Sequence, residues 1–251
     1  AGNLLYHFKH LMMNKKIQLG LMVISLIAIS ISAVSCFAHV NGNGKVVKED
    51  RNIAGFEAIT VNNGIDVLVS QDTFEKVVVE ADENIQKILR TEVRDGKLKI
   101  FLEEGVNEAK RMKVYVTVKQ LNTLDAGSGS EVKSGNQIKA EKMKIHSSSG
   151  SDVTMEINCN EASLESSSGS DLTVSGTVQS LKAGSSSGSD LNASKLIAEK
   201  GDVSASSGSD LSVHVTKELK AHASSGSDIT VHGNPALRDS NSSSGGDISY
   251  R

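Results

Sequence analysis

The chain has 251 residues, 38% hydrophobic and 23% charged, so it can bury a substantial core and is not compositionally disordered. Its formal net charge of −3, with both signs scattered along the chain, argues against a nucleic-acid partner. One proline, 22 glycines and an aromatic share of 3% favour a β-rich repeat over a helical enzyme.

Residues 1–36 are expected to hold upstream residues followed by an export signal. The eleven residues before Met12 precede a good start site and are left out of the fold. A short basic stretch, "NKK", then leads into an apolar run from Leu19 to Val34, which is the layout of a secretory signal. This run is shorter than the roughly 20 residues of a spanning helix, so we expect export, with a membrane-spanning anchor as the alternative.

The stretch "AVSC" resembles the bacterial lipobox, in which a diacylglyceryl group is attached to the cysteine, here Cys36. A lipobox usually has leucine where Ala33 stands, and residues 33–35 also fit an ordinary cleavage site that would discard Cys36 with the signal. Cys159 is the other cysteine, and we expect it to be a small buried residue. Neither an intramolecular disulfide nor a cysteine-based metal site is expected.

Residues 37–45 are expected to form a short linker, and residues 46–125 an irregular N-terminal β part. "AITVNNGIDVLVSQ", "KVVVEA", "KLKIFL" and "KVYVTV" have strand character, and Asn63-Gly64 and Asp95-Gly96 are turn signals. The stretch "DENIQKILRTEV" between them fits either a short helical turn or another strand.

Residues 126–251 carry a regular repeat built on the phrase "SGSD". Its glycines are separated by 21, 19, 19, 20, 18 and 19 residues, and each is followed by a small residue, an acid and a β-branched residue or leucine. The glycines and acids are Gly129 with Glu131, Gly150 with Asp152, Gly169 with Asp171, Gly188 with Asp190, Gly208 with Asp210, Gly226 with Asp228, and Gly245 with Asp247.

Each repeat contains two short apolar alternations, such as Val153 with Met155 and, further on, Ala162 with Leu164. Such a unit cannot bury its apolar face alone, so equivalent strands must stack about 4.8 Å apart. The expected fold is all-β: a single-stranded parallel β-helix, or solenoid, with coils of roughly 18–21 residues. A plain antiparallel sandwich is the alternative, although it would not explain identical corners.

The corner residues are interpreted as structural. Glycine tolerates positive φ, while serine and aspartate bond to nearby backbone groups and satisfy the turn. The competing interpretation is a ladder of carboxylates that binds cations, with Ca²⁺ as the first candidate. Two unit charges about 4.8 Å apart repel by only about 0.9 kcal/mol in water, so no metal is required. We therefore expect no cofactor and no metal.

Four segments together carry a resemblance to a known family. "FEAITVNNGIDVLVSQ", "VVVEADENIQKILRTEVRDGKLKI", the serial "SGSD" corners and the ending "SSSGGDISYR" resemble the putative auto-transporter adhesin head GIN domain family. The resemblance extends from Val46 to Arg251. It implies a right-handed β-helix in an exported protein, frequently a lipoprotein, typical of Bacteroidetes. It also implies adhesion as the function and brings no catalytic residues.

Many exported lipoproteins of Bacteroidetes that reach the outer face carry an acidic run just after the lipidated cysteine, and "CFAHVNGNG" has none. We therefore expect anchoring to the outer membrane at either the cell surface or the periplasmic face. The expected partners are the membrane, through the lipid, and an unknown protein or glycan ligand. End-to-end self-association is a further expectation if the last coil near Ile248 exposes unpaired strand edges.

Two patterns that suggest chemistry are given structural interpretations instead. "GSSSG" at residues 184–188 matches a nucleophile elbow, but it is one of several near-identical corners, so Ser186 is not expected to be catalytic. Four histidines lack the i, i+4 spacing of a helical metal site and are expected at solvent-facing strand positions: His146, His214, His222 and His232.

The sequence thus predicts a non-catalytic protein of the cell envelope that acts as an adhesin or binding surface. A periplasmic scaffold or sensor is the first alternative. A polysaccharide-active β-helix enzyme is the second, and it would need a unique pair of carboxylates that the repeated acids do not single out.

Overall fold

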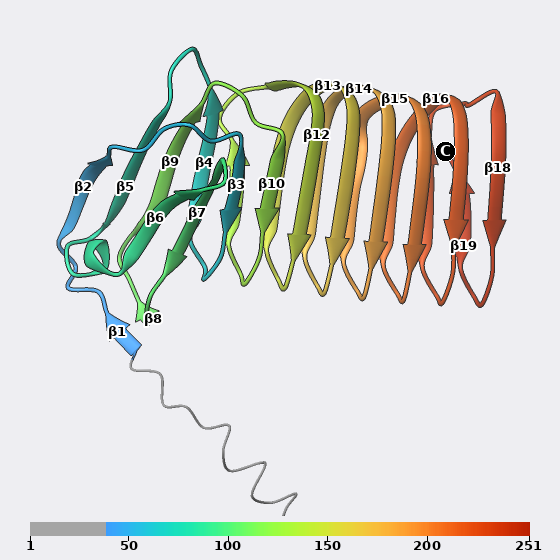
Figure 1. Cartoon of the computed structure of the whole chain (residues 1–251). Coiled ribbons are helices and arrows are strands. Elements are labelled where there is room, and N and C mark those ends of the chain that lie inside the picture. Colours follow the sequence, from blue (N-terminus) through green and yellow to red (C-terminus); the bar gives the residue numbers. More distant parts are fainter. Residues whose placement is uncertain (1–38) are drawn as a thin grey trace, which may run out of the picture. The chain divides into compact units, whose positions relative to one another are not determined.

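The repeated segments lie directly on one another in a computed structural model that describes residues 39–251 (Figure 1). The repeated acids pair in parallel register, Asp152 with Asp171 and Asp171 with Asp190. The chain is therefore an all-β parallel solenoid, which confirms the fold predicted from the repeat. Cys36 and the predicted signal lie outside the described residues.

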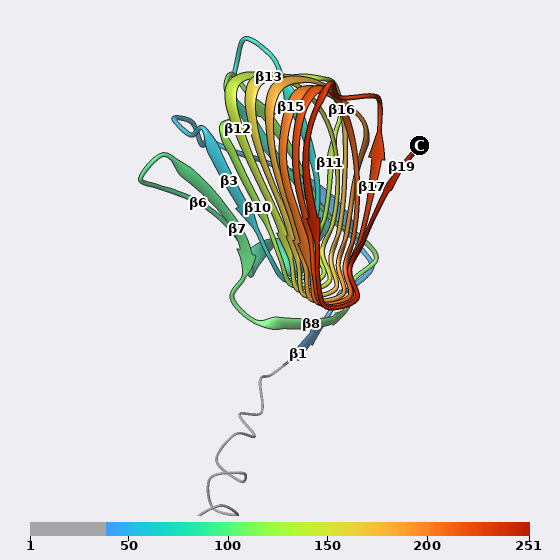
Figure 2. The ribbon, with the colours of Figure 1, turned by 90° about the vertical axis from the view of Figure 1, so that its right-hand side faces the viewer.

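The solenoid winds in a right-handed sense. In Figure 2, which looks at the C-terminal end, the strands on the left run downward and those on the right run upward, while the chain advances toward the viewer. Each coil narrows to a tight corner at its lower end and widens at its upper end. The cross-section is therefore a wedge. Its narrow end and its broad end require different kinds of residue.

The regular coils share four parts, illustrated by residues 152–170. A first wall (residues 152–155) leads to a broad end (156–161), a second wall (162–166) returns, and a serine corner (167–170) closes the coil. The strands of this region are β10 (Thr123–Ala126), β11 (Glu131–Ser134), β12 (Ile138–Ser148), β13 (Asp152–Ser167), β14 (Asp171–Ser186), β15 (Asp190–Ser206), β16 (Asp210–Ala223), β17 (Asp228–His232), β18 (Leu237–Ser242) and β19 (Asp247–Tyr250).

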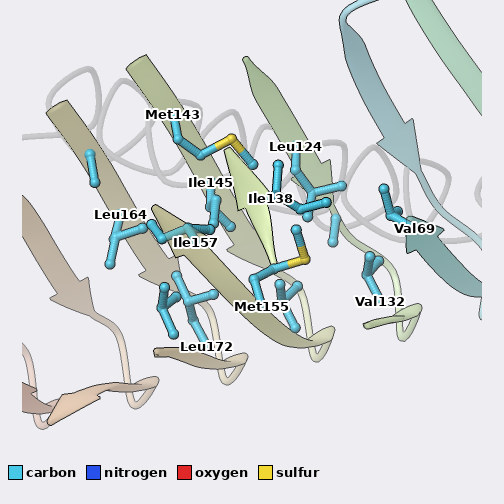
Figure 3. Close-up of a cluster of buried hydrophobic side chains, with 14 of the residues drawn as sticks. Val69, Leu124, Val132, Ile138, Met143, Ile145, Met155, Ile157, Leu164 and Leu172 are labelled. Atoms are coloured by element: carbon cyan, nitrogen blue, oxygen red, sulfur yellow. The ribbon is translucent and has the colours of Figure 1, made fainter. Parts of the chain in front are cut away.

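The core is a column of apolar side chains between the two walls. Inward and outward side chains alternate along each strand, so Val153 and Met155 are buried while Thr154 is exposed. Figure 3 shows Ile145 and Ile157 from neighbouring coils directed into this space. Every coil adds its own apolar rows to the column, and burial of that surface is the main stabilising contribution to the stack.

The solenoid already begins within residues 46–125. Strands β3 and β4 form a coil that pairs in parallel with β10 and β11, and β7 and β9 pair in parallel with the other side of that coil. The strands here are β1 (His39–Asn41), β2 (Val46–Arg51), β3 (Ala58–Val61), β4 (Asp66–Gln71), β5 (Lys76–Asp82), β6 (Leu89–Arg94), β7 (Lys97–Leu102), β8 (Gly105–Glu108) and β9 (Met112–Val118). Strands β2, β5 and β6 extend the walls in antiparallel pairing.

The stretch that fitted either a helical turn or a strand contains both. A 3-10 turn, η1 (Ile85–Lys87), precedes strand β6, and Asp95-Gly96 then turns the chain into β7 with φ values of 52° and 71°. No helix among residues 39–251 has the length and apolar character needed to span a membrane.

The last described coil has polar residues where earlier coils are apolar. Arg238 pairs in register with buried Leu219, and Ser240 with buried Ala221. The Arg238 guanidinium lies 4.5 Å from the centre of the Tyr250 ring. Among the described residues, no strand pairs with the outer edges of β18 and β19. The C-terminal end of the core is therefore occupied by an inward-facing arginine stacked on a tyrosine. An inward-pointing charge is a device that discourages pairing at an exposed strand edge.

Candidate functional site

Each serine corner is a two-residue turn whose central residues both have positive φ. Ser149 has a φ of 55° and Gly150 one of 70°, and the Ser151 N–H donates to the Ser148 carbonyl at 3.2 Å. Two consecutive residues with positive φ are the signature of a type I′ turn. The same pairs occur at Asn63-Gly64, Ser128-Gly129, Ser168-Gly169, Ser187-Gly188, Ser207-Gly208, Ser225-Gly226 and Ser244-Gly245.

The corner glycines are required by backbone conformation and not by lack of space. A Cβ atom built at Gly188 would have no atom within 4 Å, but φ there is +66°. The preceding Ser187 has a φ of 60° although it carries a side chain. A non-glycine residue in this conformation costs about 1 kcal/mol, which other interactions of the corner must offset.

In most corners the serine after the glycine supplies those interactions. Ser170 Oγ accepts a hydrogen bond from the Ser167 N–H at 3.2 Å and donates to the Ser147 carbonyl of the preceding coil at 2.8 Å. Ser189 is bonded in the same way to Ser186 and Ser166. Both hydroxyl groups are buried. They provide polar partners inside a buried corner, so backbone groups there are not left unpaired.

A second serine lies beside the first inside three of the corners. Ser166 Oγ is 3.0 Å from Ser170 Oγ and 2.9 Å from the Ser170 carbonyl, and Ser185 makes the equivalent contacts with Ser189. The next two coils have alanine at this position, Ala205 and Ala223. The position before the turn therefore accepts either small residue.

The glycine and the acid connect neighbouring coils through their backbone groups. The Gly169 N–H donates to the Ser187 carbonyl of the next coil at 3.2 Å, and the Asp171 N–H donates to the Ser151 carbonyl of the preceding coil at 2.9 Å. The Asp171 side chain points outward and is exposed. The corner is thus a continuous hydrogen-bonded ladder in which the acid takes part through its N–H.

The sequence interpretation selected the glycines and acids and did not identify the buried serines. The signal was present, because Ser151 has the inward phase of the alternation that continues through Val153 and Met155. A serine at the inward phase in six successive repeats, from Ser130 to Ser227, indicates a satisfied buried hydroxyl.

The acids form a row along the outer edge of the corner. Partial burial and then repulsion from Asp210 and Asp171 raise the pKa of Asp190. Among residues 39–251, no group of three or more histidine, cysteine, aspartate and glutamate side chains is arranged to hold a metal ion. The row consists of Asp66, Glu131, Asp152, Asp171, Asp190, Asp210, Asp228 and Asp247, and Lys113 of β9 pairs in register with Asp66 at its N-terminal end.

The remaining candidate residues are spread over both walls, although His146 and Ser186 line the same depression. His214 and His232 pair across neighbouring coils, whereas His146 and His222 lie on the second wall. Ser186 begins a serine corner, and its N–H donates to Ser189 Oγ at 3.2 Å. Cys159 is buried, and burial, with a smaller contribution from Glu141, raises the pKa of its thiol to about 11.

Residues 42–45, which follow β1, form an N-terminal strap over a buried carboxylate. Asp82 Oδ2 accepts the backbone N–H of Gly44 at 3.3 Å and of Lys110 at 3.1 Å. A Cβ atom at Gly42 would lie 1.8 Å from the same oxygen, so only glycine fits there. The Gly42 N–H also donates to the Glu108 carbonyl at 2.7 Å. Most of the predicted linker is therefore bonded to the solenoid.

A comparison with protein families agrees with this architecture. The family described as putative auto-transporter adhesin, head GIN domain, matches residues 55–235. The chain belongs to this family. The match takes in the coil of β3 and β4 as well as the regular repeat, so both parts of the solenoid belong to the head GIN domain. No curated protein sequence matches the chain.

Solved structures share the head GIN domain fold. A putative adhesin from Bacteroides fragilis is 19% identical with a TM-score of 0.80, and the match covers 84% of this chain and 100% of that one. A putative lipid binding protein from Parabacteroides distasonis is 20% identical with a TM-score of 0.72, covering 85% and 100%. A putative adhesin from Parabacteroides merdae is 18% identical with a TM-score of 0.69, covering 85% and 99%. At such identities the likeness establishes the fold alone.

Proposed function

We propose that this head GIN domain is an exported, non-catalytic binding module that acts as an adhesin head and is anchored to the outer membrane through a lipid on Cys36. The observation that carries the proposal is the solenoid itself, in which parallel register aligns outward-facing polar side chains into rows across many coils. A rigid surface of this kind is suited to holding an extended ligand by many weak contacts.

The outer rows support recognition by polar groups. On the first wall the row next to the acids contains Thr154, Thr173 and Asn192 in register. On the second wall one outward row carries charged and hydroxyl side chains, namely Lys144, Ser163, Lys182, Asp202 and Lys220. The backbone groups beneath these rows are already bonded between coils, so a ligand must be recognised by the side chains.

The proposed anchor is close in sequence to the head. Cys36 precedes His39, where β1 begins, by three positions. A lipid at Cys36 would therefore hold the head near the membrane, on whichever face of it the protein lies. Membership of the adhesin family favours the cell surface, and the periplasmic face would instead favour a scaffold or sensor role.

The test is protease accessibility and antibody labelling on intact cells, compared with lysed cells and with cells carrying Cys36→Ala. Labelling of intact cells, with release of the protein into the medium in the variant, is the expected result. Adherence of those cells to surfaces should then fall when the protein is deleted. Protection from protease until lysis would rule out the adhesin role and leave the periplasmic scaffold.

A further inference from the structure

One glycine of the second wall is not required by the fold. Gly184 lies in the outward row that continues through Glu165 and Ser204, and it has no positive φ. A Cβ atom there would meet only Ser204 Oγ, at an ordinary contact distance of 3.8 Å. Glycine inside a strand is destabilising because it has no side chain to pack and loses more conformational freedom on folding.

The missing side chain opens a notch in the outer surface. The notch holds about 290 Å³ and has Glu165 and His146 on one side, Ser204 on the other and Lys182 at its edge. A second depression of about 480 Å³ adjoins it and is also lined by Lys182, together with Lys144 and Ser163. The two depressions share Lys182 in their linings and together span the coils of β10 and β12–β15, on the order of 19 Å; we refer to the two together as the groove.

Among the described residues, two lysines of this groove form no ion pair, although Asp202 of the next coil follows Lys182 in the same outward row. Lys144, Ser163 and Lys182 occupy successive coils of one outward row. The neighbouring Lys142 pairs with Glu161 at 2.9 Å. Within residues 39–251, Lys144 and Lys182 have no carboxylate at ion-pair distance, so two free ammonium groups flank the small Ser163. An anionic group placed over Ser163 would contact both of them.

The backbone groups and side chains of the groove also indicate which kind of extended ligand could bind there. A peptide that added as a strand would need free backbone N–H and C=O groups, and those of β12, β13 and β14 are already paired on both sides. Apart from the Lys142–Glu161 ion pair, the groove instead offers hydroxyl groups, an imidazole and the Glu165 carboxylate as well as the two ammonium groups. These side chains complement a chain that carries both hydroxyls and carboxylates.

We propose that this groove, from Lys144 through the notch at Gly184, binds a linear acidic oligosaccharide, with a uronate carboxylate between Lys144 and Lys182 and the next sugar in the notch. This inference rests on the proposed binding function and specifies its ligand class. No aromatic side chain lines the groove, so hydrogen bonds and charge hold the sugar, and binding weakens as salt is added.

The test is calorimetric titration with tetragalacturonate and with its methyl ester, which keeps the hydroxyls and removes the charge. The wild-type protein should bind the acid, less tightly at raised salt, and bind the ester at least roughly fivefold more weakly. Gly184→Gln should abolish binding while leaving thermal stability equal or higher, because the new side chain fills the notch without a clash. Lys144→Gln with Lys182→Gln should weaken binding by a similar factor.

Lys220→Gln is the matched control, because Lys220 lies in the same row but outside the groove, between Asp202 and Asp239. Wild-type affinity in Gly184→Gln would overturn the proposal, as would equal binding of the ester or of tetraglutamate. If cells that display Gly184→Gln still adhere like wild-type cells, the groove assignment fails and the adhesin role stands. If adherence is lost only when the whole protein is deleted, the result likewise supports the adhesin role and rejects the groove assignment.

Discussion

The two ends of each coil differ in how strictly they are specified. At the serine corner the acids pair in unbroken register through Asp171, Asp190 and Asp210, although the coils between them differ in length. At or next to the broad end the register shifts, between Thr173 and Ser175 in one coil and between Ala193 and Ile197 in the next. Extra and missing residues are therefore accommodated away from the corner.

The difference arises from hydrogen bonding. A corner that turns within two residues leaves room for only one arrangement of its serine hydroxyls and backbone groups, and each coil fixes the next through the Gly188 and Asp190 N–H groups. The broad end has a longer path and exposed residues, so its backbone groups can bond to water. The corner fixes the register of the stack, and the broad end tolerates variation.

Insertions should separate the two ends most clearly. One alanine inserted between Ser187 and Gly188 would break bonds to both neighbouring coils, so we expect a loss of about 3 kcal/mol or more in the free energy of unfolding. The same insertion between Gln179 and Ser180, at the broad end, should cost within about 1 kcal/mol. Denaturant titration measures both, and equal losses would contradict the distinction.

Removing one buried hydroxyl should have the next largest effect. Ser189→Val leaves the Ser186 N–H and the Ser166 carbonyl without their partner and should cost about 2–3 kcal/mol. Ser180→Val is the control at the exposed broad end, where a change within about 0.5 kcal/mol is expected. A Ser189→Val protein as stable as wild type would show that the hydroxyl ladder contributes nothing.

Substitutions at Gly188 should distinguish conformation from space. Gly188→Val should destabilise by about 1–2 kcal/mol because a β-branched residue resists positive φ, whereas Gly188→Asn should cost less because asparagine tolerates it. No atom lies within 4 Å of the new Cβ, so size should not matter. Thermal unfolding of both variants gives the comparison, and equal shifts in melting temperature would point to crowding instead.

Removing one charge from the acid row should have the smallest effect on stability. The pKa of Asp190 is raised on folding, so the folded protein binds the proton more tightly and the carboxylate opposes folding once it is ionised. The penalty is full above the folded pKa and absent below the ordinary value of 3.8. Asp190→Asn should therefore raise stability at neutral pH by no more than about 0.5 kcal/mol and leave it unchanged in acid. Unfolding curves across that pH range test this, and destabilisation at neutral pH would assign the carboxylate a bonding role.

The sequence predicted the regular coils well because each repeat contains its own turn signal and its own alternation. It did not predict how residues 46–125 are arranged. There, alternation identifies β5, β7 and β9 as strands but does not identify their partners. Strands β7 and β9 follow β3 and β4 in sequence, yet they pair with the side of that coil opposite to β10 and β11. Strand pairing between distant segments depends on which edges are available after other coils form.

The candidate site was predictable only in part, for a related reason. Repetition made the corner glycines and acids visible, but Gly184 is a single departure from the repeat and resembles an ordinary strand glycine in sequence. Its meaning depends on the empty space above it and on the two free lysines nearby. Such a groove is a property of neighbouring coils and not of any one repeat.

The N-terminal strap determines how such a head would respond to force. In a head anchored at Cys36 and pulled by a bound surface, tension enters through β1 and reaches the strap before the solenoid. The first elements to bear the load are the short pairing of β1 with β8 and the hydrogen bonds from the Gly42 N–H to Glu108 and from the Gly44 N–H to Asp82. These contacts would break before the long ladders of hydrogen bonds between coils. The strap would then extend as a tether while the binding surface stayed folded.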